Sequence, residues 1–201
     1  MQEQTEFYLD QILKDCWQRL ADGAQSPKHL FHFPVISTLN KDFPESRVVV
    51  LRAVNPKEHT LIFYSDVRSP KIRQIKESPN VSWVFYDAKS RIQIRIKAKA
   101  VLHFKDEISL EAWENSRLES KKVYLSQQVP SSKVDEPTDG LPQDLKMVNL
   151  TEENLKSGYE NFVVVKTEVL ELDWLFLAHH EHRRARFMKE LEGFNMEWIQ
   201  P

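Results

Sequence analysis

The chain has 201 residues, a formal net charge of −2 and one cysteine. This length fits one domain with a substantial core, and the near-neutral charge lacks the basic field that nucleic-acid-binding proteins carry. A single cysteine excludes an intrachain disulfide and is typical of a reducing compartment. No apolar run reaches the roughly 20 residues of a membrane span, and no signal-peptide pattern precedes the domain. We therefore expect a cytoplasmic protein that binds neither nucleic acid nor membrane.

The first part of the chain predicts a helix followed by short strands. Apolar residues recur at helical spacing from Glu6 to Ala24, within a helical segment of residues 1–30, and Cys16 lies on that stripe. Residues 31–39 predict a strand and residues 41–46 a turn. Apolar and aromatic runs bounded by turn residues then predict further strands over residues 48–54, 60–65 and 81–86.

A short helix is predicted between the second and third of these later runs. Ser69 is placed to cap it, Pro70 suits its first position, and Pro79 ends it. The N-terminus of a helix favours an anion, and Lys71 lies in its first turn. Arg47 on the preceding strand adds a second cation. These residues allow a phosphate site, but on their own they more often mark the solvated face of a surface helix.

The second half of the chain contains one strongly patterned strand among segments with weaker patterns. Residues 92–100 alternate strictly between apolar and polar side chains, which predicts a half-buried strand with Gln93 on its polar face. Residues 107–116 and 118–128 look helical, residues 129–150 form a loop rich in proline and polar residues, and Thr151 starts a short capped helix. The C-terminal region, residues 162–201, is rich in β-formers. Its first stretch, residues 162–177, predicts either two strands or one bent strand.

Three histidines near the C-terminus raise the question of a metal. On a strand His180 and His182 share one face while His179 points away, and no cysteine accompanies them. We therefore expect no metal site.

The motifs taken in order resemble a known family. The runs that carry this similarity are Arg47–Arg52, Phe63–Asp66, Ser69–Lys71, Ser78–Asn80 and Arg91–Gln93. Together they look like the FMN-binding core of the pyridoxamine 5′-phosphate oxidase family, over residues 33–128 and again from residue 162 to the C-terminus. The resemblance implies one α+β domain over residues 1–201. It would be a split β-barrel of antiparallel strands with peripheral helices, binding FMN between the two chains of a homodimer.

The same resemblance implies roles for particular residues. Gln93 would meet the flavin ring, and Trp174 and Arg186 would reach FMN from the second chain. Pyridoxamine or pyridoxine 5′-phosphate would be the first substrate to test, with hydride passing to the flavin, and no catalytic side chain is implied. The implied FMN-binding residues are Arg47, Val48, Val49, Val50, Leu51, Arg52, Tyr64, Ser65, Ser69, Lys71, Gln93, Gln128, Trp174 and Arg186. The implied substrate-binding residues are Arg52, Arg117, Arg183 and Arg184.

Several positions depart from the family pattern. Arg52 stands where the family has lysine, Pro70 where it has arginine, and Val129 where it has serine. Trp113 takes the place of a substrate-binding tyrosine. Because the FMN positions survive better than the substrate positions, the sequence predicts a divergent flavoprotein with an eroded substrate site. The alternatives are a non-catalytic protein that stores or senses FMN, and a cofactor-free β-barrel interaction module.

Overall fold

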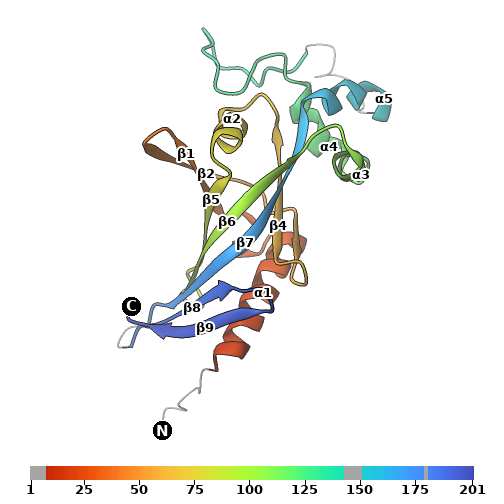
Figure 1. Ribbon diagram of the computed structural model, residues 1–201. Helices are drawn as coiled ribbons and strands as arrows, with labels where there is room; N and C mark the ends of the chain where they lie inside the picture. The colour runs from red at the N-terminus through yellow and green to blue at the C-terminus, as the bar shows by residue number, and fades with distance from the viewer. Residues whose placement is uncertain (1–7, 143–150, 179–180) are drawn as a thin grey trace.

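The computed structural model describes residues 8–142, 151–178 and 181–201. Within these residues nine strands form one antiparallel sheet with short helices packed around it (Figure 1). The sheet does not close, so the fold is an α+β split barrel, as the sequence predicted. The helices are α1 (Leu9–Gln25), α2 (Pro70–Glu77), α3 (Glu107–Glu114), α4 (Leu118–Lys121) and α5 (Glu152–Leu155), with 3₁₀ helices η1 (Leu30–His32), η2 (Lys122–Leu125) and η4 (Lys156–Asn161). The strands are β1 (Val35–Asn40), β2 (Phe43–Val48), β3 (Ala53–Asn55), β4 (Thr60–Asp66), β5 (Asn80–Asp87), β6 (Ile92–His103), β7 (Phe162–Phe176), β8 (Arg183–Lys189) and β9 (Phe194–Ile199).

Strand β7 joins the parts of the sheet. The order is β2-β1-β5-β6-β7-β4-β3, and the β8–β9 hairpin extends from the second half of β7. The first half of β7 pairs with β4, the second half with β8, and nearly its whole length with β6. The β6–β7 register shifts between Lys97 and Ala98, where Leu170 has no counterpart. A bulge of this kind bends a strand, so the β-rich C-terminal stretch is one bent strand.

The two faces of β6 separate the core from the outside of the sheet. Every second residue from Ile92 to Ala100 is buried, which confirms the alternation predicted for this strand. These residues pack in one cluster with Trp83 and Trp174. We call the opposite side, which carries Gln93 and Arg95, the outer face.

Helix α1 closes one end of this core. Its buried residues include Cys16, Trp17 and Leu20 at the predicted helical spacing, and it lies next to β3 and β9. Burial raises the pKa of the Cys16 thiol, so this cysteine is an unreactive core residue. Residues 1–7 of the predicted N-terminal segment lie outside the described residues. Among the described residues, no helix is both long and apolar enough to cross a membrane.

A second, smaller core forms under the α3–α5 helices. Trp113 lies here against Tyr124 and Phe162. The buried ammonium of Lys121 sits 5.4 Å from the centre of the Trp113 ring and 2.8 Å from a carboxylate oxygen of Glu152. The predicted helical region 118–128 shortens to α4 and η2, so residues 126–128 are not helical. Residues 129–142 contain no helix or strand, as predicted for this part of the loop, and residues 143–150 of the predicted loop lie outside the described residues.

One sequence prediction is wrong in a way that matters for the site. Residues 41–46 were expected to form a turn, but only Lys41 and Asp42 do so, and Phe43 already pairs with Asn40. Lys41 takes the left-handed conformation (φ 52°) that such a tight hairpin requires. Strand β2 is an exposed edge strand with Pro44 and Glu45, so it lacks the apolar alternation that marks a buried strand.

Candidate functional site

A pocket of about 630 Å³ lies between strand β2 and the start of helix α2. Three cationic side chains line it: Arg47 from β2, and Lys71 and Arg73 from α2. Two residues of the 126–142 segment, Pro130 and Ser131, complete its wall. Two segments far apart in the sequence thus bring positive charge to one cavity.

Arg47 is held in this pocket by neighbours on two elements. Its guanidinium donates to Thr38 Oγ1 on β1 at 2.5 Å and to Gln74 Oε1 on α2 at 3.3 Å. Thr38 and Gln74 are both buried. Burial lowers the pKa of Arg47, while the nearby carboxylate of Glu45 acts in the opposite direction. A half-buried, oriented guanidinium suits an anion with planar or tetrahedral oxygens.

Lys71 approaches from the other side, at the start of α2. Pro70 occupies the first helical position, as predicted, and Lys71 follows it. The Lys71 ammonium donates to Ser65 Oγ at 3.2 Å and to Ser69 Oγ at 3.3 Å. Burial and the positive charge of Arg47 lower the pKa of Lys71, and Asp66 partly offsets them. An anion in the pocket would favour the charged form of Lys71 and so oppose this lowering of its pKa.

The role expected of Ser69 as a side-chain cap is wrong. Ser69 occupies the N-cap position, but its hydroxyl makes no capping hydrogen bond. It lies 3.1 Å from Ser65 Oγ and accepts from Lys71 instead. The two hydroxyls and the ammonium therefore form one polar cluster at the N-terminal end of α2.

Glu45 is an acidic residue of the pocket that the sequence analysis did not single out. Its carboxylate accepts hydrogen bonds from Asn40 Nδ2 at 2.6 Å, Gln74 Nε2 at 2.8 Å and Arg47 at 3.2 Å. The hydrogen bonds from Gln74 and Asn40 lower the pKa of Glu45. The spacing of Glu45 and Arg47, two residues apart on one strand, is the signal that would have placed both on one face. The sequence does not display this signal, because the polar residues 43–46 predict a turn instead of the strand that pairing with β1 makes of them.

Arg68 takes no part in the pocket wall. Its guanidinium pairs with Asp66, at 2.7 Å for the shortest contact, and donates to the carbonyl of Ser126 at 2.9 Å. Arg68 thus ties the start of the 126–142 segment to the end of β4. Gln128 lies two residues before the pocket residue Pro130 and is exposed.

The residues expected near a flavin ring occupy two environments. Val48 is exposed and Gln93 half-buried, and the strand pairing puts both on the outer face. Leu51 is fully buried, and Val49 and Val50 are half-buried between β2 and β3. The guanidinium of Arg52 lies 5.6 Å from the ring centre of Tyr64. Burial raises the pKa of Tyr64, and the positive charge of Arg52 opposes that shift.

The C-terminal residues expected to contact FMN lie on opposite sides of the sheet. Trp174 is 2 % exposed and stacks on Phe176 in the core. Its cross-strand partner is Ala185, so Arg186 points to the outer face, where Glu197 holds it. The structure does not bring Trp174 and Arg186 together within one chain.

The arginines expected to bind substrate are also separated. Arg184 pairs with the buried carboxylate of Asp173, which accepts from Arg95 as well. Arg183 pairs with the exposed Glu181. Arg117 is exposed at the start of α4, far in the sequence from Arg183 and Arg184 on β8. Trp113, expected beside substrate, lies in the second core.

The histidine cluster gives no metal site in the described part of the chain. His179 and His180 lie outside the described residues, and His182 is exposed. No group of three or more His, Cys, Asp or Glu side chains in the described residues is arranged to hold a metal ion.

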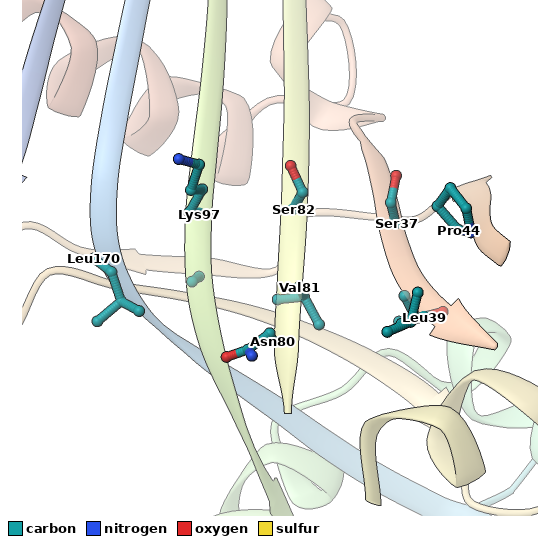
Figure 2. Close-up of a pocket in the computed structure, with 10 residues that line it drawn as sticks. Ser37, Leu39, Pro44, Asn80, Val81, Ser82, Lys97 and Leu170 are labelled. Atoms are coloured by element: carbon teal, nitrogen blue, oxygen red, sulfur yellow. The ribbon is translucent and has the colours of Figure 1, made fainter. Parts of the chain in front are cut away.

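A second pocket, of about 400 Å³, opens beside the β1–β2 hairpin. Its lining residues come from five strands, β1, β2, β5, β6 and β7. Figure 2 shows their side chains, among them Leu39 on β1, Val81 on β5 and Leu170 at the bulge of β7. Leu39 and Leu170 are exposed, as are Val48 and Tyr86 on the outer face. An apolar surface of this kind on a sheet face is typical of an interface.

The fold and this arrangement define the class: an α+β split-barrel protein with a cationic pocket at the start of α2. A family model described as pyridoxamine 5′-phosphate oxidase, FMN-binding domain, matches residues 10–104. This match confirms the resemblance to the pyridoxamine 5′-phosphate oxidase-like family seen in the motifs, at low sequence identity.

Relatives and solved structures agree with this assignment. A Caenorhabditis elegans protein provisionally named pyridoxamine 5′-phosphate oxidase is 34% identical over 128 residues, which are 61% of this chain and 52% of that protein. The pyridoxine/pyridoxamine 5′-phosphate oxidase of Psychrobacter arcticus is 26% identical over 76% of this chain and 70% of its own. The match thus spans only about half the length of the nematode relative.

The solved structures support the fold. A pyridoxamine 5′-phosphate oxidase-related, FMN-binding protein from Nostoc punctiforme superposes with a TM-score of 0.73 at 17% identity, covering 94% of this chain and 97% of that one. PhzG from Burkholderia lata, solved with tetrahydrophenazine-1-carboxylic acid, gives 0.68 at 19% identity, covering 98% and 95%.

Proposed function

We propose that this protein binds FMN and acts as a flavin-dependent oxidoreductase related to pyridoxamine 5′-phosphate oxidase. The observation that carries the proposal is that Arg47 and Lys71, from separate segments, line one pocket with Ser69. The family match supports flavin as the ligand. The flavin phosphate would occupy this pocket.

The residues of the pocket fit a phosphate group. Arg47 and Lys71 supply charged donors, and the Ser69 hydroxyl, which also lines the pocket, supplies a neutral one. Ser65 lies behind this lining, where its hydroxyl accepts from the Lys71 ammonium. Charge-assisted bonds of this kind are the strongest hydrogen bonds to phosphate. Both cations have pKa values lowered by burial, so a dianion would stabilise their charged forms.

The flavin ring would lie along the outer face, between two copies of the chain. Val48 and Gln93 share this face, and the amide of Gln93 both donates and accepts, as a flavin ring edge requires. We propose that a second copy covers the exposed apolar side chains around the 400 Å³ pocket. In that homodimer Gln128 and Arg186 would approach the flavin of the other copy.

FMN would supply the chemistry by accepting a hydride from substrate, while the chain binds and orients both molecules. Arg52, Arg117, Arg183 and Arg184 are the proposed contacts to an anionic substrate group. The names of the relatives make pyridoxamine or pyridoxine 5′-phosphate the first substrate to test. We place the reaction in the cytoplasm, on the ground that the chain has a single cysteine and so cannot form an intrachain disulfide.

A specific observation favours a second candidate, a non-catalytic FMN-binding protein that stores or senses the cofactor. Arg184 is already engaged by the buried Asp173, which Arg95 also contacts. An arginine whose charge is balanced in this way offers less to a substrate anion. Anaerobic mixing with candidate amines separates the two: rapid bleaching of the flavin supports the enzyme, and uniformly slow bleaching supports the binder.

The proposed cofactor is tested by the absorbance spectrum of the purified protein. We expect the visible absorbance bands of flavin, or their appearance on titration with FMN, and release of FMN on denaturation. Protein that is colourless and also fails to take up added FMN would refute the proposal. As a control, the variant Arg47→Ala/Lys71→Ala should lose most of its FMN affinity while keeping its fold.

A further inference from the structure

The anion pocket contains a carboxylate that a phosphate site does not need. Glu45 lies within 3.2 Å of the Arg47 guanidinium and shares the pocket with Lys71 and Arg73. Its low pKa keeps it ionised at neutral pH, because Gln74 and Asn40 both donate to it. Any phosphate that reaches Arg47 therefore meets a fixed negative charge.

Glu45 is not what holds Arg47 in place. The guanidinium already donates to Thr38 Oγ1 and Gln74 Oε1, and these two acceptors are 2% and 1% exposed. The Glu45 side chain is 43% exposed at the rim of the pocket. Its contact with Arg47 is longer than the 2.5 Å bond from Arg47 to Thr38. Two buried neutral acceptors position the cation, and the carboxylate mainly adds charge.

We propose that Glu45 opposes phosphate binding in this pocket and so makes the flavin cofactor exchangeable instead of permanently held. The carboxylate occupies guanidinium hydrogens that a phosphate oxygen would use, and it offsets one of the three positive charges that line the cavity. This inference rests on the proposed binding of FMN. It assigns to one residue the control of cofactor affinity.

The test is the variant Glu45→Gln, which keeps the side-chain shape and an acceptor oxygen while removing the charge. We expect its FMN affinity, measured by quenching of flavin fluorescence, to rise about tenfold at low ionic strength. The gain should shrink in high salt, because Glu45 is partly exposed and screened. Wild-type protein should lose FMN during gel filtration under conditions in which the variant retains it.

Two controls isolate the phosphate. Riboflavin, which lacks the phosphate, should bind wild type and Glu45→Gln equally. Glu77→Gln removes the same charge at the exposed end of α2, outside the pocket lining, and should leave FMN affinity unchanged. Inorganic phosphate should raise the melting temperature of Glu45→Gln at lower concentrations than it does for wild type.

The outcomes separate this inference from the proposed function. If wild type binds FMN and Glu45→Gln binds it equally or more weakly, Glu45 is a positioning residue and the inference is overturned. An equal gain for riboflavin also overturns it, because the effect would then not act through the phosphate. If neither protein binds FMN, the proposed function itself fails and the inference falls with it.

Discussion

The substitution Lys71→Met tests the phosphate pocket without threatening the fold. The Lys71 ammonium donates to the neutral hydroxyls of Ser65 and Ser69, so a phosphate oxygen would be a stronger acceptor than either. A charge-assisted hydrogen bond contributes about 1.5–3 kcal/mol, so its loss should weaken FMN binding roughly ten- to 150-fold. The apolar stem of methionine fills the space of the lysine stem.

The same substitution should not destabilise the protein. Burial and the charge of Arg47 set the pKa of Lys71 below its ordinary value of 10.5 in the folded chain. The unfolded chain therefore binds this proton more tightly, and the charged lysine opposes folding at every pH below the folded pKa. That penalty disappears as the pH rises through the folded pKa and on to 10.5. Removing the charge should leave the melting temperature at neutral pH unchanged or higher.

The assay is a fluorescence titration with FMN and with riboflavin, paired with thermal melts. Lys76→Met is the matched control, because it removes the same charge from an exposed position on α2 outside the pocket lining. Lys71→Met with unchanged FMN affinity and an intact melt would refute the assignment of the phosphate to this pocket. A parallel loss of riboflavin binding would show that the ring site had been disturbed instead.

Three further predictions concern the pH dependence of FMN binding, the ion pair in the second core and the apolar outer face. FMN affinity should fall as the pH rises through the folded pKa of Lys71, which lies below 10.5, and the alkaline decline should be smaller in Lys71→Met, as titrations between pH 7 and 10 will show. Glu152→Ala should lower the free energy of unfolding by about 1–3 kcal/mol in urea titrations, because it leaves the buried ammonium of Lys121 without its carboxylate. Val48→Asp should convert a homodimer into monomers in sedimentation experiments, because it puts a charge into the apolar outer face.

The predictions for Glu152→Ala and Val48→Asp each have a matched control substitution. Glu153→Ala removes a carboxylate from the same turn of α5 and should have little effect on stability. An equal loss in both variants would point to helix electrostatics in place of the ion pair. Val123→Asp puts a charge on an exposed valine of η2 and should leave the oligomeric state unchanged. A wild-type protein that sediments as a monomer would contradict the proposed dimer.

Patterns within short stretches of the sequence were enough to predict some of the helices and strands. The alternation in β6 fixed its buried face, and Pro70 and Pro79 marked the two ends of α2. The order of the motifs led to the family and hence to the split barrel. These features depend on the sterics of single residues or on periodicity, which a sequence displays directly.

The rest depended on tertiary contacts. Strand β2 carries polar residues at an exposed edge, so only its pairing with β1 reveals it, and Glu45 was overlooked with it. The side of the sheet that Trp174 faces is set by the register of β7 with β8, which the hairpin determines. Arg68, a cation beside α2 in the sequence, turns away from the pocket because Asp66 and the carbonyl of Ser126 engage it. The spacing of residues along the chain does not show which of several possible partners a side chain such as Arg68 will bind.

Strand β7 pairs with β4, β6 and β8, and these pairings should hold the protein together even after a protease has cut the chain once. A protease that cuts in the irregular segment 126–142 would leave an N-terminal piece that carries β4 and β6, and a C-terminal piece that carries β7. The two ladders formed by β7 with β4 and β6 bury apolar side chains such as Val163, Val165 and Leu172, which neither piece can cover alone. The two pieces should therefore co-purify as one particle after cleavage, and separately expressed pieces should recombine into it.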